Sequence, residues 1–169
     1  MLDNRSIGVF DSGLGGLTCV KEIMHLLPHE NVIYFGDTGR VPYGTRSPET
    51  IIKYSVSDVN FLKTFDIKAV VIACGTVSSI AMEYLTSKFD IPIIGVVEPA
   101  AAAAVNASKN NNIGIIGTSG TIASGKYAKH IKILSPTATV TQTACPLFVP
   151  FVESGFLYHP ATKLIAEEY

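Results

Sequence analysis

Residues 68–74 read KAVVIAC and form an almost uninterrupted apolar run. Such a run is typical of a β-strand that is covered on both faces, as strands are in a parallel sheet between layers of helices. The small and hydroxyl residues GTVSS at 75–79 follow, and a helix is predicted from about residue 78 to residue 88. The stretch therefore predicts a strand, a tight turn and a helix in succession, which is the repeating unit of an α/β fold.

The same alternation continues on both sides of this stretch. The other runs with strand character are 6–10, 31–36, 92–97, 112–117 and 137–144. The segments with helical character are 15–27, about 47–65, 98–107, much of 118–131, and 160–169. Repeated strand–helix units of this kind predict doubly wound parallel sheets in the α/β class.

The composition narrows the classes of protein to consider. Apolar residues make up 47% of the 169 residues, enough to bury a sizeable core, and the net charge is −1 with no basic run. This charge argues against nucleic acid or an anionic membrane surface as the main partner and favours a small-molecule ligand. No apolar stretch approaches the roughly 20 residues of a membrane span, and the polar start MLDNRS predicts no signal peptide. Three cysteines without metal-ligand spacing suit a reducing compartment, so we expect a cytoplasmic protein without a metal site.

Three polar loops follow predicted strands, where ligands bind in open parallel sheets. The first, FDSGLGGL at 10–17, has glycines that allow a close approach of the backbone to a ligand. It lacks the spacing of a dinucleotide-binding loop and the ending of a P-loop. Two interpretations remain open: a loop that contacts a ligand, or a tight turn in which Asp11 caps the following helix.

The second and third loops leave similar alternatives. GDTGRVPYGTRS at 36–47 is long and polar for a plain connection, and is either a functional loop or a surface turn stiffened by Pro42. In the third loop, ACGTVSS at 73–79, Cys74 ends the predicted strand. Cys74 is either an inert core residue or a reactive thiol, whose pKa a helix N-terminus would lower below its ordinary value of about 8.5.

Other reactive residues give weaker signals. Cys19 lies within a predicted helix and Cys145 precedes a proline, so packing is the expected role of both. The four histidines form no spacing with one another, with cysteine or with acidic residues that suggests a metal site. A serine-hydrolase motif is absent from the sequence.

Six stretches of the sequence, taken in order, resemble the glutamate racemases of the aspartate/glutamate racemase superfamily. They extend from residue 7 to residue 155 and read IGVFDSGLGGLT, YFGDTGRVPYGTRS, VVIACGTVSS, IIGVVEPA, IGIIGTSGTI and ACPLFVPFVESG. The resemblance implies a cofactor-free isomerase that interconverts L- and D-glutamate and supplies D-glutamate for bacterial peptidoglycan. In this family two cysteines face opposite sides of the substrate α-carbon, so that one thiolate removes the α-proton and the other thiol returns a proton to the opposite face.

Matched by position, Cys74 is one of the two acid/base cysteines. The resemblance assigns substrate binding to Asp11, Ser12, Tyr43, Gly44, Gly75 and Thr76, and supporting roles to Asp37, Glu153, Thr118 and Thr121. Two departures stand out. Gly75 lies where the family usually has asparagine, and no stretch matches the Gly-Cys-Thr-His motif that carries the family's second cysteine. Cys145 belongs to a different family motif and does not take that role.

The resemblance also implies two similar α/β domains, with residues 1–97 forming most of the first and 98–169 an incomplete second. The last segment, PATKLIAEEY, stops inside a helical pattern, which suggests either a truncated sequence or a helix that closes the chain. We expect glutamate as the small-molecule substrate, and a homodimer is one assembly that the protein could form. The alternatives are another racemase of the superfamily, acting on aspartate or hydantoins, or a non-catalytic module that binds an amino acid.

Overall fold

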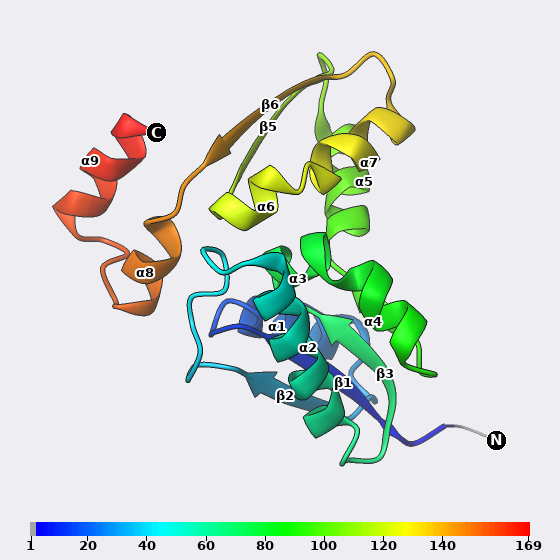
Figure 1. Ribbon diagram of the computed structural model, residues 1–169. Helices are drawn as coiled ribbons and strands as arrows, with labels where there is room; N and C mark the ends of the chain where they lie inside the picture. Colours follow the sequence, from blue (N-terminus) through cyan, green and yellow to red (C-terminus); the bar gives the residue numbers. More distant parts are fainter. Residues whose placement is uncertain (1–2) are drawn as a thin grey trace.

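Figure 1 shows the computed structural model, which describes residues 3–169. Residues 1 and 2, with which the predicted first domain begins, lie outside the described residues. The strands are β1 (Ser6–Asp11), β2 (Val32–Gly36), β3 (Ile67–Ile72), β4 (Ile93–Gly95), β5 (Asn112–Gly117) and β6 (Thr139–Ala144). The helices are α1 (Leu17–Leu26), α2 (Pro48–Leu62), α3 (Gly75–Ile80), α4 (Met82–Lys88), α5 (Val97–Ala107), α6 (Ser119–Ala123), α7 (Lys126–Leu134), α8 (Phe148–Glu153) and α9 (Pro160–Glu168).

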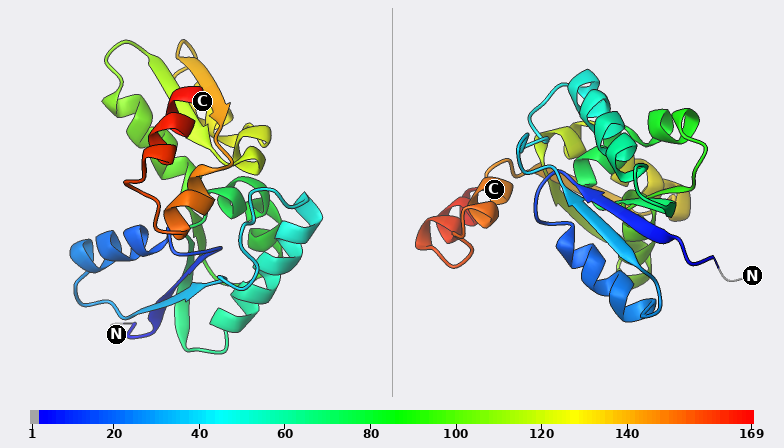
Figure 2. Two further views of the ribbon diagram at one scale, coloured as in Figure 1. Left: turned by 90° about the vertical axis from the view of Figure 1, so that its left-hand side faces the viewer. Right: turned by 90° about the horizontal axis from the view of Figure 1, so that it is seen from below.

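The first sheet has the strand order β2-β1-β3-β4, and all of its strand pairs are parallel. Helix α1 covers one face of this sheet, and α2 and α4 cover the other (Figure 2). Its core includes Phe10, Ile51, Leu62, Val70 and Ile72, whose side chains are fully buried. Burial of each such side chain contributes about 1.5–3 kcal/mol, which makes this sheet the main source of stability. The prediction of a doubly wound α/β fold is thereby confirmed.

The second sheet is smaller and consists of the parallel pair β5-β6. A compact cluster of Ala101, Ile113, Ile131 and Ala138 joins it to α5 and α7. Helices α8 and α9 extend from the end of β6, on the side of the molecule away from α4 and α5 (Figure 1). Strands β1–β4 lie within the first predicted domain and β5–β6 within the second, while the boundary at residue 97 stays a prediction.

The structure differs from the sequence prediction in the segment 78–88. One helix was expected there, but α3 begins already at Gly75 and ends at Ile80, and α4 follows from Met82. The two helices are joined at Ala81, which is fully buried and caps both. The earlier start brings the first turn of α3 directly beside Cys74.

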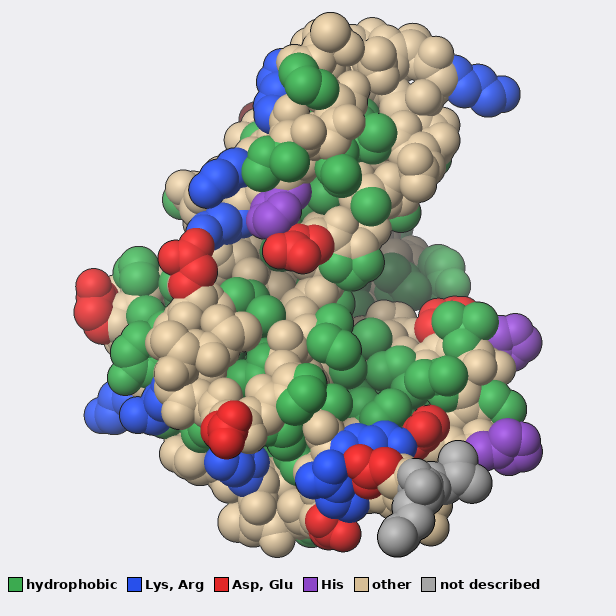
Figure 3. All heavy atoms as spheres, turned by 90° about the vertical axis from the view of Figure 1, so that its right-hand side faces the viewer, with side chains coloured by type: hydrophobic (Ala, Val, Ile, Leu, Met, Phe, Trp, Pro, Cys, Tyr) green, Lys and Arg blue, Asp and Glu red, His purple; other side chains and the backbone are tan. Residues whose placement is uncertain are grey.

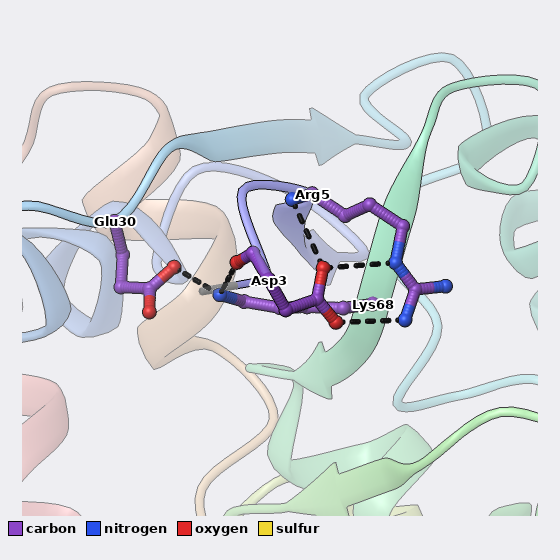
Figure 4. A network of polar contacts seen from close by, with 4 residues as sticks. All are labelled: Asp3, Arg5, Glu30 and Lys68. Atoms are coloured by element: carbon purple, nitrogen blue, oxygen red, sulfur yellow. Dashed lines mark hydrogen bonds and ion pairs between the residues drawn. The ribbon is translucent and has the colours of Figure 1, made fainter. Parts of the chain in front are cut away.

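The edge of the first sheet at which its strands begin carries a network of charged groups (Figure 4). Lys68 donates to the backbone oxygen of Asp3 at 2.8 Å and forms an ion pair with Glu30, and Arg5 pairs with Asp3 at 2.8 Å. These contacts fix the start of β1 against β3, at the end of the strands opposite the three polar loops.

The outer surface carries charges of both signs. On the face that includes α4, α5 and α7, acidic and basic side chains are interspersed among apolar ones (Figure 3). Within residues 3–169, no helix combines the length and the apolar character needed to cross a bilayer.

Candidate active site

The topology of the first sheet creates a crevice between β1 and β3. These strands are neighbours, with Phe10 in register with Ile72. From β1 the chain crosses to β2 on one side, and from β3 to β4 on the other. The carboxyl ends of two such strands diverge into separate loops, and the gap between them is the usual ligand site of an open α/β sheet. Ser12 and Cys74 lie on either side of this gap, with Ser12 Oγ 3.3 Å from Cys74 Sγ.

A cavity of about 680 Å³ lies over this crevice and is lined by residues of both sheets and their loops. Its lining contains ten of the eleven residues predicted from the sequence: Asp11, Ser12, Tyr43, Gly44, Cys74, Gly75, Thr76, Thr118, Thr121 and Glu153. The eleventh, Asp37, is buried behind the lining and bonds to the hydroxyl of Tyr43. The fold therefore brings residues from distant parts of the chain to one cavity.

Cys74 is only 5% exposed and is the N-cap residue of α3, two residues after the end of β3. Burial raises the pKa of its thiol above the ordinary value, and the negative charge of Asp11 raises it further. The hydrogen bond with Ser12 and the backbone contacts of Ser12 and Val77 act in the opposite direction. The expectation that the helix N-terminus would lower this pKa is therefore wrong in direction, because desolvation outweighs the partial charge of a helix of six residues.

Asp11 is buried and organises the first loop. Its Oδ2 accepts hydrogen bonds from the backbone N–H of Gly13 at 3.2 Å and of Gly16, the residue before α1, at 2.9 Å. A Cβ at residue 16 would lie 2.6 Å from the Cβ of Asp11, so only glycine fits there. Asp11 therefore fixes the turn before α1, but it is not the cap of that helix, whose N-cap is Gly16 without a side-chain cap; the residue also lines the cavity.

Tyr34 and Glu153, from other parts of the chain, lie against the first loop at Gly13. Tyr34, in β2, donates from its hydroxyl to the backbone oxygen of Gly13 at 2.7 Å, and burial raises the pKa of Tyr34 to about 12. Glu153, at the end of α8, approaches from the other side: a Cβ at Gly13 would lie 1.9 Å from its Oε1. The absence of a side chain at Gly13 thus allows the Glu153 carboxylate to reach the first loop.

The hydroxyl of Tyr43 is fixed by a network of charged side chains. Its hydroxyl donates to Asp58 at 2.8 Å and also contacts Asp37. Arg40 joins the two carboxylates, with Nε 2.6 Å from Asp37 and Nη2 2.5 Å from Asp58. Burial raises the pKa of Asp58 to about 6 in spite of these partners. Because its hydroxyl is occupied, Tyr43 faces the cavity with its ring and backbone, and Asp58 is a supporting residue that the sequence analysis missed.

Hydroxyl groups join the two sheets beside the cavity. Thr76 Oγ1, in α3, lies 2.9 Å from Thr118 Oγ1, which lies 3.0 Å from Thr121 Oγ1. The backbone N–H of Gly120, in α6, donates to the backbone oxygen of Gly44 at 2.9 Å. Figure 1 shows α3 and α6 next to each other between the sheets. The predicted supporting residues Thr118 and Thr121 therefore connect the second sheet to the loops of the first.

The other lining residues, which sequence reasoning did not assign to the cavity, include Cys145 and Tyr127. Cys145, expected to pack, is buried as predicted but also faces the cavity. Tyr127 contributes its side chain from α7. Among residues 3–169 there is no group of three or more His, Cys, Asp or Glu side chains arranged to hold a metal ion. The cavity combines two thiols, two carboxylates and several hydroxyls, which suits a small molecule with charged ends and proton transfer at a carbon between them.

Comparison with known proteins gives a consistent result. Residues 12–144 match the family model described as Asp/Glu/Hydantoin racemase. A protein from Geobacter metallireducens named glutamate racemase is 50% identical over 165 residues, which cover 98% of this chain and 61% of that protein. The structure of a glutamate racemase from Francisella tularensis in complex with D-glutamate superposes with a TM-score of 0.91 at 44% identity, covering 99% of this chain and 63% of that one. A glutamate racemase structure from Bacillus anthracis gives a TM-score of 0.89 at 40% identity, covering 98% and 61%. The chain thus spans about three-fifths of the length of these relatives.

Proposed function

Since the chain belongs to the Asp/Glu/hydantoin racemase family, we propose that its protein interconverts L- and D-glutamate by proton transfer at the α-carbon. The observation that carries the proposal is the cavity at the β1–β3 crevice, where Cys74 and Ser12 face residues of the second sheet. The named activity of the relatives at about 50% identity, and the D-glutamate bound to one of the similar structures, support glutamate as the substrate.

Cys74 is the proposed acid/base residue. As a thiolate it takes the α-proton of glutamate: the carbon–hydrogen bond breaks, its electron pair stays on carbon, and the proton moves to sulfur. A raised thiol pKa makes the thiolate a stronger base, which suits removal of a weakly acidic proton. Ser12 stabilises the thiolate by hydrogen bonding, and the substrate ammonium group offsets the charge of Asp11.

The remaining residues bind the substrate in this proposal. Asp11 and Glu153 attract the ammonium group, since both carboxylates line the cavity near Cys74. The hydroxyls of Thr76, Thr118 and Thr121 and the backbone of Gly44 and Gly75 are suited to carboxylate oxygens. Inversion requires a proton donor on the opposite face of the carbanion, and we assign that role to no residue of this chain.

The test is exchange of the glutamate α-proton for deuterium in D2O, followed by proton NMR with L- and D-glutamate in separate samples. Exchange needs only one acid/base residue, because the thiol can return a deuteron to the same face. We expect exchange in the unsubstituted chain and its loss in Cys74→Ala. Cys19→Ala is the matched control, because Cys19 lies outside the cavity lining.

The outcomes separate the alternatives. Exchange that survives in Cys74→Ala would refute the role of Cys74. Absence of both exchange and glutamate binding in a folded sample of the unsubstituted chain would mean that these 169 residues are an incomplete racemase. Faster exchange with aspartate or a hydantoin would identify another racemase of the family. Binding of glutamate without exchange would indicate a non-catalytic binding module.

We also infer the biological setting from the same proposal. The protein acts in the cytoplasm without a cofactor and supplies D-glutamate for peptidoglycan, and it forms a homodimer. Cell fractionation, racemase activity after dialysis against a chelator, and light scattering test these points in turn.

A further inference from the structure

Tyr127 has a hydroxyl that the contacts described above do not use. The residue lies in the first turn of α7 and lines the cavity from the side of the second sheet. Within residues 3–169, every fully buried side-chain oxygen or nitrogen has a hydrogen-bond partner. The Tyr127 oxygen has no such partner there, so it is accessible from the cavity and is free to donate a hydrogen bond to a ligand.

The space in front of this hydroxyl lies beside Gly75. At the point where a Cβ of residue 75 would stand, Tyr127 Oη is 3.9 Å away and Thr121 Oγ1 is 4.0 Å away. Apart from the neighbours of Gly75 in the chain and in its own helix, no other heavy atom of residues 3–169 lies within 4 Å of that point. The space beside Gly75 therefore accommodates a methyl-sized group in van der Waals contact and is bounded by two hydroxyl groups.

The two hydroxyls differ in their availability. Thr121 lies 3.0 Å from Thr118 and 3.5 Å from Thr76, so its hydroxyl takes part in the threonine cluster. Tyr127 adds a donor with no competing partner among the described residues. A hydroxyl donor that faces an open space next to a backbone turn matches an oxygen with negative charge better than an ammonium group.

We propose that Tyr127 binds a carboxylate oxygen of the substrate in the space beside Gly75, an inference that rests on the proposed function. Tyr127 is then a substrate-binding residue contributed by the second sheet, and the glycine at position 75 is what leaves room for the contact. Burial raises the pKa of Tyr127, and the neighbouring Cys74 raises it further, so the hydroxyl keeps its proton at neutral pH.

The experiment measures the affinity of the chain for L- and D-glutamate by isothermal titration calorimetry. Tyr127→Phe removes only the hydroxyl. Loss of a hydrogen bond to a charged group should decrease the affinity for glutamate about 10- to 100-fold. Tyr158→Phe is the matched control, because Tyr158 is 94% exposed and lies outside the cavity lining.

A second variant tests the space itself. Gly75→Ala adds one methyl group to the first turn of α3 without a clash, so the variant should unfold at the same or a higher temperature. If a carboxylate oxygen occupies the space, the methyl group displaces it and affinity decreases by about tenfold or more, although the fold is intact. A purely structural role of Gly75 would not separate affinity from stability in this way.

The results distinguish this inference from the proposed function. Unchanged affinity in Tyr127→Phe, or in Gly75→Ala, would overturn the inference while leaving the proposed function in place. Absence of glutamate binding by the unsubstituted folded chain would refute both. Loss of affinity in both variants, with Tyr158→Phe unchanged, would support the assignment.

Discussion

Asp58→Asn tests the charge network behind Tyr43. The Asp58 side chain is fully buried and has two polar partners, the hydroxyl of Tyr43 and the guanidinium of Arg40. Burial nevertheless raises the pKa of this carboxyl from 3.8 to about 6. Asparagine has nearly the same shape but does not titrate, so the variant isolates the effect of the ionisation.

The sign of the effect follows from proton binding. Between the two pKa values the folded state binds more protons at Asp58 than the unfolded state, so the unfolding free energy decreases as the pH rises. The free-energy cost of keeping Asp58 ionised in the folded state is absent below the unfolded pKa of 3.8 and complete above the folded pKa of about 6. The difference of about two units between the folded and unfolded pKa values corresponds to about 3 kcal/mol of unfolding free energy. The unfolding free energy of the unsubstituted chain, relative to that of Asp58→Asn, should therefore decrease by about 2 kcal/mol between pH 4 and pH 7.

Urea unfolding at several pH values measures this difference. The sequence contains no tryptophan, so far-ultraviolet circular dichroism is the suitable probe. Asp90→Asn removes one negative charge from an exposed position and serves as the control for net charge. If the difference between the unsubstituted chain and Asp58→Asn stays constant with pH, Arg40 and Tyr43 offset the burial completely and the reasoning is refuted.

Two further substitutions test the cavity. Asp11→Asn removes a charge that raises the pKa of Cys74, so we expect Cys74 to react severalfold faster with iodoacetamide at pH 8 by mass spectrometry; an unchanged rate would contradict this. Gly44→Ala would place a carbon 2.4 Å from the Cβ of Thr118, so we expect a loss of about 1–3 kcal/mol in urea unfolding and weaker glutamate binding. Gly39→Ala is its control, because a Cβ there has nothing within 4 Å among the described residues, and equal stability of the two variants would contradict the expected clash.

The position of the cavity could be predicted from the sequence. The apolar runs that end at Phe10 and Cys74 indicate parallel strands, and the loops after such strands meet at one edge of the sheet. This rule places Ser12 near Cys74 without knowledge of the side-chain positions. Their contact confirms the topology, while the chemical roles of both residues stay predictions.

Other features depended on tertiary packing and could not be predicted in the same way. Asp58 lies on the buried side of α2 with Ser55 and Leu62, and an acidic residue among those positions was the available signal. The break at Ala81 has no glycine or proline to indicate it. The direction of the Cys74 pKa shift required its burial, because the helix terminus and desolvation act in opposite directions.

Deuterium exchange of the Gly120 N–H, which donates to the Gly44 oxygen, can be used to measure motion between the two sheets at the cavity. The Gly120 N–H belongs to the first turn of α6, where helix amides lack partners within their own helix. It is protected from solvent deuterium by an oxygen in a loop of the other sheet. Its exchange rate therefore measures how often the second sheet separates from the loop that carries Tyr43, and a ligand that bridges the cavity should slow it.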